Sequence, residues 1–294
     1  MGYVGRFAPS PTGPLHLGSL VAALGSYLDA RRHGGRWLLR IEDLDTARNQ
    51  SGCVEEIQRT LEALGLLWDG PVEYQSRRLA LYEEAIATLD RRALTFACHC
   101  TRRTLGEHEE TAYPGTCRNR PAAAGPAALR FRVDESETVS FTDRFQGPAS
   151  FALRTLGDVV IRRRDQVVAY QLAVVVDDAE QGVTDVVRGA DLLRSTPWQL
   201  LLQRSLDLPT PRYAHLPLVV EPGGEKLAKS RRSVPVDAAR ASCALIDALK
   251  LLRHAPPAEL CDEKPDALIA WALKHWNPAN LERVQIAAAP IQTP

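Results

Sequence analysis

The sequence lacks any long apolar run: no stretch approaches the roughly 18 residues that a membrane helix requires. It also lacks an excess of either charge, because 36 lysine and arginine residues balance 36 aspartate and glutamate residues. A nucleic-acid partner would therefore have to be bound by local basic patches. The N-terminus lacks the basic and apolar regions of a secretory signal. We therefore expect a cytoplasmic protein with no membrane role.

Cysteine is scarce and unevenly placed. Of six cysteines, three lie between positions 98 and 117 and the others are scattered, a pattern unlike a disulfide framework. The cluster indicates a metal site instead. Apolar residues make up 45% and charged residues 24% of the 294 residues, both ordinary for a cytosolic globular protein. The length suits one large α/β domain with a smaller inserted or appended one, and there are no internal repeats.

The beginning of the chain has the pattern of a strand, a loop, a helix and a second strand. Residues 3–8 and 36–41 are strand-like, and apolar residues recur at helical spacing from about 17 to 32. The proline-rich run 9–14 can belong to no regular element. Such a unit implies neighbouring parallel strands, whose ligands lie at the carboxyl ends of the strands beside helix N-termini. We therefore expect a ligand at the loop 9–16.

The rest of the chain is predicted in less detail. Its pattern favours helices at about 53–65 and 77–92, strands at 129–133 and 159–161, and helical structure from about 236 to 276. The apolar segment 167–176 fits either a strand or a buried helix by periodicity alone. The pattern of residues 277–294 is too weak to assign.

The loop before the first helix is suited to phosphate, because free backbone N–H groups and the helix dipole favour anions there. His16 can donate a hydrogen bond to phosphate oxygens, and Gly18 lets a nucleotide or a backbone approach closely. Far along the chain, Lys226 and Lys229 follow a Gly-Gly turn and could neutralise a triphosphate and stabilise pyrophosphate departure. Each feature alone has a simpler interpretation, a helix cap for His16 and a solvated basic turn for the lysines.

Together, the segments 16–19 (His-Leu-Gly-Ser) and 226–230 (Lys-Leu-Ala-Lys-Ser) resemble the two signature motifs of class I aminoacyl-tRNA synthetases. Their order and the elements they occupy agree with that family, although Leu227 and Ala228 stand where Met and Ser are usual. The resemblance implies an α/β fold with a Rossmann-like parallel sheet. It also implies that His16, Gly18, Lys226 and Lys229 are catalytic, and that these four and Ser19 bind ATP with Mg²⁺.

Segments 5–13 and 40–48 look like the glutamyl branch of this family. A glutamate ligand brings two carboxylates and one ammonium, so its site needs cations, a carboxylate and neutral donors. Taken singly, charged residues such as these are more simply explained as surface ion pairs. By resemblance, Glu42 would contact the ammonium, and Arg6 and Arg188 the carboxylates. The implied pocket consists of Arg6, Phe7, Ala8, Pro9, Ser10, Glu42, Tyr170 and Arg188.

The cysteine cluster offers Cys98 and Cys100 on a tight turn and Cys117 further on. Three thiolates and one more donor satisfy tetrahedral zinc. His99 and His108 are candidate fourth ligands by their chemistry, whereas the resemblance implies Tyr113. Reduced thiols without a metal are the alternative. We expect one structural Zn²⁺ per chain, fixing the insertion near the acceptor end of an RNA.

Only 64 residues follow Ser230, too few for the large anticodon-binding region of glutamyl-tRNA synthetases. The short architecture resembles the tRNA-modifying members of the branch. These activate L-glutamate without tRNA and transfer it to queuosine at the wobble position of tRNA(Asp). Two alternatives remain: a truncated glutamyl-tRNA synthetase that charges a tRNA 3′ end, and an inactive zinc-stabilised RNA-binding module that contacts phosphates through arginines 162–164 and 231–232.

The expected organisation combines these observations. A catalytic fold in two halves, 1–97 and 156–235, encloses a zinc-binding insertion at 98–126 that could extend to about 155. A helical region, 236–294, follows without a full anticodon-binding domain. We expect the protein to be a monomer.

Overall fold

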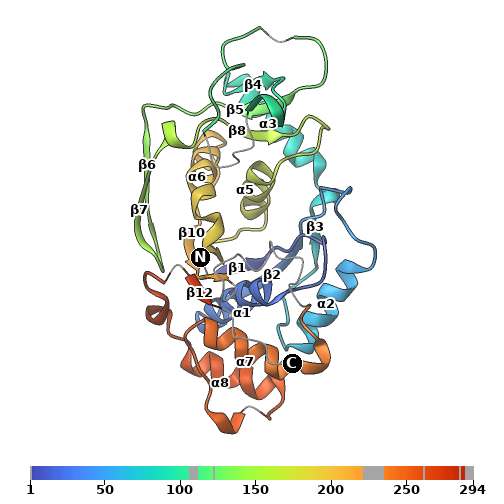
Figure 1. The fold of residues 1–294 in the computed structure, drawn as a ribbon, viewed down its shortest axis with the longest axis vertical. Coiled ribbons are helices and arrows are strands. Elements are labelled where there is room, and N and C mark those ends of the chain that lie inside the picture. The colour runs from blue at the N-terminus through green and yellow to red at the C-terminus, as the bar shows by residue number, and fades with distance from the viewer. Residues whose placement is uncertain are drawn as a thin grey trace.

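The computed structural model describes residues 2–105, 112–121, 123–220, 235–260, 262–284 and 286–288 (Figure 1). Lys226, Lys229 and His108 lie outside these residues, so their predicted roles are not addressed by the structure. None of the helices in the described ranges combines the length and the apolar character needed to cross a membrane.

A parallel sheet forms the middle of the molecule and confirms the predicted fold class. Strands β1 (Val4–Phe7), β2 (Arg36–Ile41) and β3 (Glu73–Tyr74) pair in that order, all parallel. Strands β9 (Asp185–Gly189) and β10 (Arg212–Leu216) form a second parallel pair. This pair lies beside β1, where the Thr184 amide donates to the Val4 carbonyl at 2.9 Å. The strand β2 is almost wholly buried, as expected for a parallel strand covered on both faces.

Helix α1 (Leu17–Arg32) connects β1 to β2, as the helical spacing predicts. Its buried side chains pack on β1 and β9 on one side and on the C-terminal helix α7 (Ala241–Leu251) on the other. Helices α2 (Cys53–Ala63) and α3 (Leu79–Arg91) fall where the sequence predicts them. The loop between β1 and α1 therefore opens at the carboxyl edge of the sheet.

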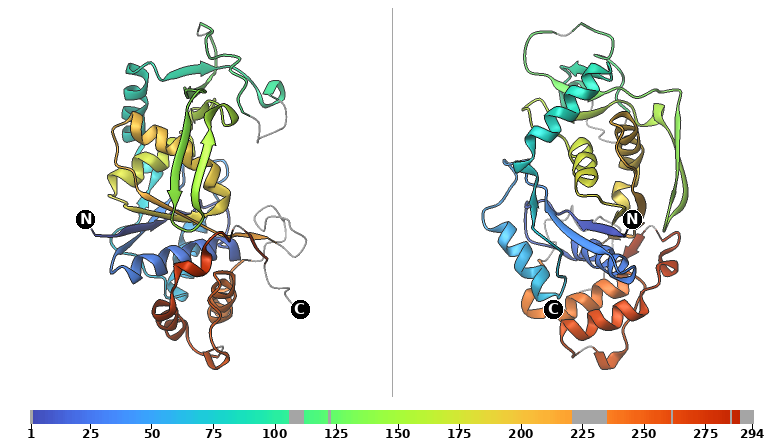
Figure 2. Two further views of the ribbon diagram at one scale, coloured as in Figure 1. Left: turned by 90° about the vertical axis from the view of Figure 1, so that its left-hand side faces the viewer. Right: turned by 180° about the vertical axis from the view of Figure 1, so that it is seen from behind.

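An antiparallel sheet of β4 (Thr95–Cys98), β5 (Ala128–Phe131) and β8 (Val159–Arg162) lies at the opposite end of the molecule from α7 (Figure 1). A short helix, α4 (Arg102–Leu105), follows β4. A hairpin of β6 (Thr138–Asp143) and β7 (Gly147–Ala152) runs from this end towards the central sheet (Figure 2), and β6 contacts β10 there. The hairpin therefore connects the antiparallel end of the molecule to the central parallel sheet.

The segment 167–176, whose pattern fits either structure, contributes to a helix, α5 (Tyr170–Glu180). It packs against α3, β8 and α6 (Thr196–Ser205). Because neighbouring elements cover several of its sides, its apolar residues are not confined to one stripe. Seven consecutive residues, 172–178, are buried, and they include Asp177 and Asp178. Two buried carboxylates on such a helix need cationic or hydrogen-bonding partners.

The last part of the chain contains α7, helix α8 (Pro265–His275) and strand β12 (Ile286–Ala288). Strand β12 pairs in parallel with β11 (Leu218–Val220). The sequence leaves this strand unassigned because its pairing partner lies far back along the chain. The described residues also form short 3-10 helices: η1 (Gln75–Arg77), η2 (Leu153–Thr155), η3 (Ala190–Ser195), η5 (Ala238–Arg240), η6 (Ala258–Leu260) and η7 (Pro278–Leu281).

Candidate active site

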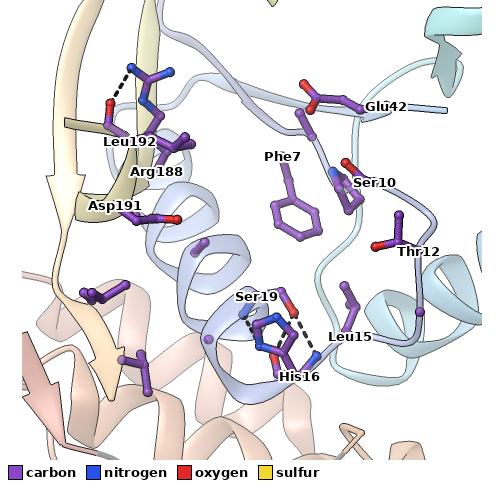
Figure 3. Close-up of a pocket in the computed structure, with 18 of the residues that line it drawn as sticks. Phe7, Ser10, Thr12, Leu15, His16, Ser19, Glu42, Arg188, Asp191 and Leu192 are labelled. Atoms are coloured by element: carbon purple, nitrogen blue, oxygen red, sulfur yellow. Dashed lines mark hydrogen bonds between the residues drawn. The ribbon is translucent and has the colours of Figure 1, made fainter. Parts of the chain in front are cut away.

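A cavity of about 560 Å³ opens at the carboxyl ends of β1, β2 and β9, beside the N-terminus of α1 (Figure 3). It lies at the loop 9–16, where the sequence predicts a ligand. Figure 3 shows Arg188 and Glu42 towards one end of the cavity and His16 at the other. All described residues assigned to the two substrates line it: Arg6, Phe7, Ala8, Pro9, Ser10, His16, Gly18, Ser19, Glu42, Tyr170 and Arg188. One space therefore joins the phosphate loop to the side chains assigned to glutamate.

His16 caps α1 in a defined tautomer. Its Nδ1 accepts from the Ser19 amide at 3.2 Å, and its own backbone N–H donates to Ser19 Oγ at 2.8 Å. Since Nδ1 is an acceptor, Nε2 carries the hydrogen of the neutral ring and is a donor, as phosphate contact requires. A Cβ on Gly18 would lie 3.1 Å from Cε1 of this ring. Gly18 therefore also makes room for the His16 side chain.

The guanidinium of Arg188 is held by neutral groups. Its Nε donates to His215 Nε2 at 3.0 Å, and Tyr170 Oη accepts from Nη1 at 3.2 Å. Further acceptors are Gln199 Oε1 at 2.7 Å and Thr196 Oγ1 at 2.9 Å. Across the described ranges, no carboxylate forms an ion pair with this arginine, which is 5% exposed. Its charge is therefore available to an anionic ligand.

Arg6 has a different environment, because its Nε lies 3.1 Å from Oδ1 of Asp178. Arg40, which is fully buried, approaches the same carboxylate with Nη1 at 2.9 Å. Burial alone would raise the pKa of Asp178, but the two guanidinium groups lower it below its ordinary value. Part of the Arg6 charge is thus already compensated. Arg40, Asp177 and Asp178 were not predicted from the sequence, although a pair of aspartates directly after an apolar run was a usable signal.

Glu42 is the least compensated carboxylate of this network. Its Oε1 is buried without a hydrogen-bond partner among the described residues, and the nearest cationic atom, Arg40 Nη2, is 3.7 Å away. Burial raises the pKa of Glu42 to about 7, against the lowering effect of Arg40 and Arg6. Since Glu42 lines the cavity, an ammonium group there could pair with this carboxylate. The arrangement can therefore bind a molecule that carries both an ammonium and a carboxylate, next to a phosphate-binding loop.

The cysteine cluster lies at the end of β4, outside this cavity. The Sγ atoms of Cys98, Cys100 and Cys117 are all within 4.8 Å of one another. Tyr113 Oη lies 3.4 Å from Cys98 Sγ and 3.8 Å from Cys100 Sγ, whereas His99 does not belong to the cluster. Burial would raise the pKa of Cys117, but hydrogen bonds from the His99 backbone and Tyr113 bring it down to about 7. Three sulfurs and one oxygen at this spacing fit a tetrahedral metal ion.

The similarity of this chain to known proteins agrees with this geometry. The family described as "tRNA synthetases class I (E and Q), catalytic domain" matches residues 3–242. The chain belongs to this family of class I tRNA synthetases. It is 52% identical over 282 residues to the glutamyl-Q tRNA(Asp) synthetase of Pseudomonas aeruginosa strain PAO1, with 96% of each chain covered. It is 53% identical over 287 residues to the protein of that name from Ectopseudomonas mendocina, with 97% of each covered.

A solved structure extends the likeness to the fold. The glutamate tRNA ligase of Elizabethkingia meningosepticum, solved in complex with its amino acid, superimposes with a TM-score of 0.77 at 26% identity. The match covers 99% of this chain and 67% of the ligase. The resemblance stated from the sequence motifs is thereby confirmed.

Proposed function

We propose that this chain activates L-glutamate with ATP, without tRNA, and transfers the glutamate to queuosine at the wobble position of tRNA(Asp). The proposal rests on two residues that line the same cavity. Within the described part of the chain, the Glu42 carboxylate has an oxygen without a donor, and the Arg188 guanidinium has no carboxylate partner. The names of relatives that match at about half identity over nearly the full chain support the choice of acceptor.

In the proposed reaction, ATP lies along the N-terminus of α1, where His16 Nε2 and the backbone around Gly18 and Ser19 contact its phosphates. Glu42 binds the substrate ammonium, and Arg188 with Arg6 orients the carboxylates. The glutamate α-carboxylate attacks the α-phosphorus of ATP, and pyrophosphate leaves. Bound Mg²⁺ supplies charge neutralisation of the phosphates, and Lys226 and Lys229 are proposed to stabilise the developing charge.

The second step transfers the acyl group. A hydroxyl of queuosine attacks the carbonyl carbon of glutamyl-adenylate, and AMP is released. No side chain of the enzyme becomes covalently modified in either step. We further propose that the enzyme acts as a monomer in the cytoplasm.

We also propose that Cys98, Cys100, Tyr113 and Cys117 hold one structural Zn²⁺. The clustering of their Sγ and Oη atoms supports this assignment. By binding ligands from both, the ion would hold the segment that contains Tyr113 and Cys117 against the end of β4.

Two measurements test the proposed function. The first is ATP–pyrophosphate exchange without tRNA, which should depend on L-glutamate; no exchange with zinc-loaded protein would contradict the activation step. The second compares glutamate transfer to queuosine-containing tRNA(Asp), queuosine-lacking tRNA(Asp) and tRNA(Glu). Transfer should require queuosine. Charging of the tRNA(Glu) 3′ end to the same extent would instead identify a shortened glutamyl-tRNA synthetase.

A further inference from the structure

Three buried side chains form a chain of hydrogen bonds behind the cavity. Asp143 lies at the end of β6, His215 on β10 and Arg188 on β9, and each is at most 5% exposed. Asp143 Oδ2 lies 2.5 Å from His215 Nδ1, and His215 Nε2 lies 3.0 Å from Arg188 Nε. Only the arginine lines the cavity.

The hydrogen positions follow from the partners. The Nε of an arginine always carries a hydrogen, so His215 Nε2 must accept. The ring hydrogen therefore resides on Nδ1 and is donated to Asp143. Burial lowers the pKa of His215, although the Asp143 hydrogen bond opposes this shift, so the ring is neutral at pH 7. A neutral imidazole thus holds Arg188 without cancelling its charge.

The Asp143 carboxylate is itself fixed in orientation. Its Oδ1 accepts from the backbone N–H groups of Phe145, Gln146 and His215, at 3.0, 2.9 and 3.1 Å. Rotation of the carboxylate would break all three hydrogen bonds, so Oδ2 stays directed at the ring. The turn of the hairpin is fixed in addition by Arg144, whose Nη1 lies 2.6 Å from Oδ2 of Asp29 on α1. The hairpin therefore presents one carboxylate oxygen to β10 in a set position.

We propose that Asp143 and His215 are positioning residues that orient the Arg188 guanidinium for a carboxylate of the substrate. The neutral imidazole of His215 separates the Asp143 carboxylate from the Arg188 guanidinium, so the two charged groups do not pair directly. A carboxylate in direct contact with Arg188 would compete with the substrate for it, whereas a neutral acceptor fixes the side chain and leaves the charge uncompensated. This inference rests on the proposed glutamate site and adds to it two residues, from β6 and β10, that do not touch the substrate.

The substitution Asp143→Asn tests this chain with a change of one atom. Because three N–H donors converge on Oδ1, the amide oxygen occupies that position and the NH₂ group faces His215 Nδ1. The ring must then accept at Nδ1 and carry its hydrogen on Nε2. Two N–H donors, His215 Nε2 and Arg188 Nε, would then face each other, and their hydrogen bond would be lost. We expect the glutamate KM to rise at least about tenfold, equivalent to about 1.4 kcal/mol, with the ATP KM unchanged. The matched control is Asp134→Asn, an exposed aspartate in the turn before β6, which should leave both constants unchanged.

Two variants of His215 separate positioning from folding. In His215→Gln the amide oxygen can still accept from Arg188, whereas in His215→Asn the shorter side chain can donate to Asp143 but does not reach Arg188. We expect the glutamate KM to rise more in the Asn variant than in the Gln variant. A role confined to folding would instead lower the melting temperature and the activity of both in parallel. These variants also keep the test decisive if Asp143→Asn fails to fold.

A double-mutant cycle measures the coupling between Asp143 and Arg188 in glutamate binding. Asp143→Asn should raise the glutamate Kd, determined by calorimetry, in the wild-type background and have no further effect in Arg188→Ala. The same increase in both backgrounds, or an equal rise in the ATP KM, overturns the inference. Wild-type protein without glutamate-dependent exchange contradicts the proposed function itself. Normal wild-type exchange with an unaltered glutamate KM in Asp143→Asn contradicts only the positioning role.

Discussion

Arg40 Nη2 lies 3.7 Å from Glu42 Oε1, and both buried atoms lack a hydrogen-bond partner among the described residues. The neighbouring carboxylates are better satisfied. Asp178 pairs with two guanidinium groups, and Asp177 accepts from Gln75, Arg78 and Tyr82. Among the described residues, the network thus leaves without a donor one carboxylate oxygen of Glu42, a residue that lines the cavity. Glu42 is therefore the expected ammonium ligand, and its burial raises its pKa to about 7 against the lowering effect of Arg40.

The first prediction concerns pH. Since burial raises the pKa of Glu42 to about 7, a growing fraction of this carboxyl is protonated as the pH falls below that value. The neutral form cannot pair with the substrate ammonium, so the glutamate KM should rise towards acid and level off above about pH 8. Exchange assays across this range measure it, with the ATP KM as the internal reference. Glu42→Gln should show a high glutamate KM that no longer varies with pH; a flat wild-type profile would contradict the assignment.

The second prediction concerns Arg188. Its replacement by alanine removes a buried cation that no described carboxylate compensates, and charge-assisted hydrogen bonds contribute about 1.5–3 kcal/mol each. Arg188→Ala should therefore raise the glutamate KM roughly 10- to 100-fold and leave the ATP KM near its wild-type value. Arg204→Ala is the control, because this arginine is exposed and pairs with Glu137 on the surface. An unchanged glutamate KM in Arg188→Ala would remove the residue from the site.

The third prediction separates the two roles of His16. Asparagine is a good helix cap but cannot reach as far as Nε2 of an imidazole, so His16→Asn should keep α1 stable while it removes the phosphate donor. We expect kcat for exchange to fall by about 10²–10³ with little change in melting temperature. His16→Ala loses both functions and should in addition cost about 0.5–2 kcal/mol of stability. Equal activity of His16→Asn and wild type would restrict His16 to capping.

The sequence predicts most accurately what depends on neighbouring residues. Helical spacing from 17 to 32 predicts α1, because one apolar stripe needs no knowledge of its partner. The contacts that shape the site depend on tertiary structure instead. Asp178 reaches Arg6 from a helix far along the chain, and Asp143 reaches His215 from a hairpin. Neither partner is visible in a local pattern, so the sequence identifies the residues at the cavity wall but not the residues that hold them in place.

The last prediction concerns the metal. Purified protein should contain one zinc per chain, because three thiols and a phenol lie close enough to bind one ion together. Cys100→Ser should lower both the zinc content and the melting temperature. Cys243→Ser should change neither, because this thiol is exposed and lies outside the cluster. Zinc analysis after dialysis measures the first quantity, and thermal unfolding the second.

The role of Tyr113 within the metal site requires its own variant. Tyr113→Phe keeps the aromatic ring, whose centroid lies 3.9 Å from Cζ of Arg130. It removes only the phenolic oxygen that lies beside the cysteine sulfurs. If the phenol is a ligand, zinc should be lost to a chelator at a lower concentration than in wild type. Unchanged retention would mean that another donor completes the tetrahedron. Because none of the four residues lines the cavity, the glutamate KM should stay constant while zinc affinity changes. A parallel rise in that KM would show that the cluster supports the site directly, which a purely structural ion at the end of β4 does not predict.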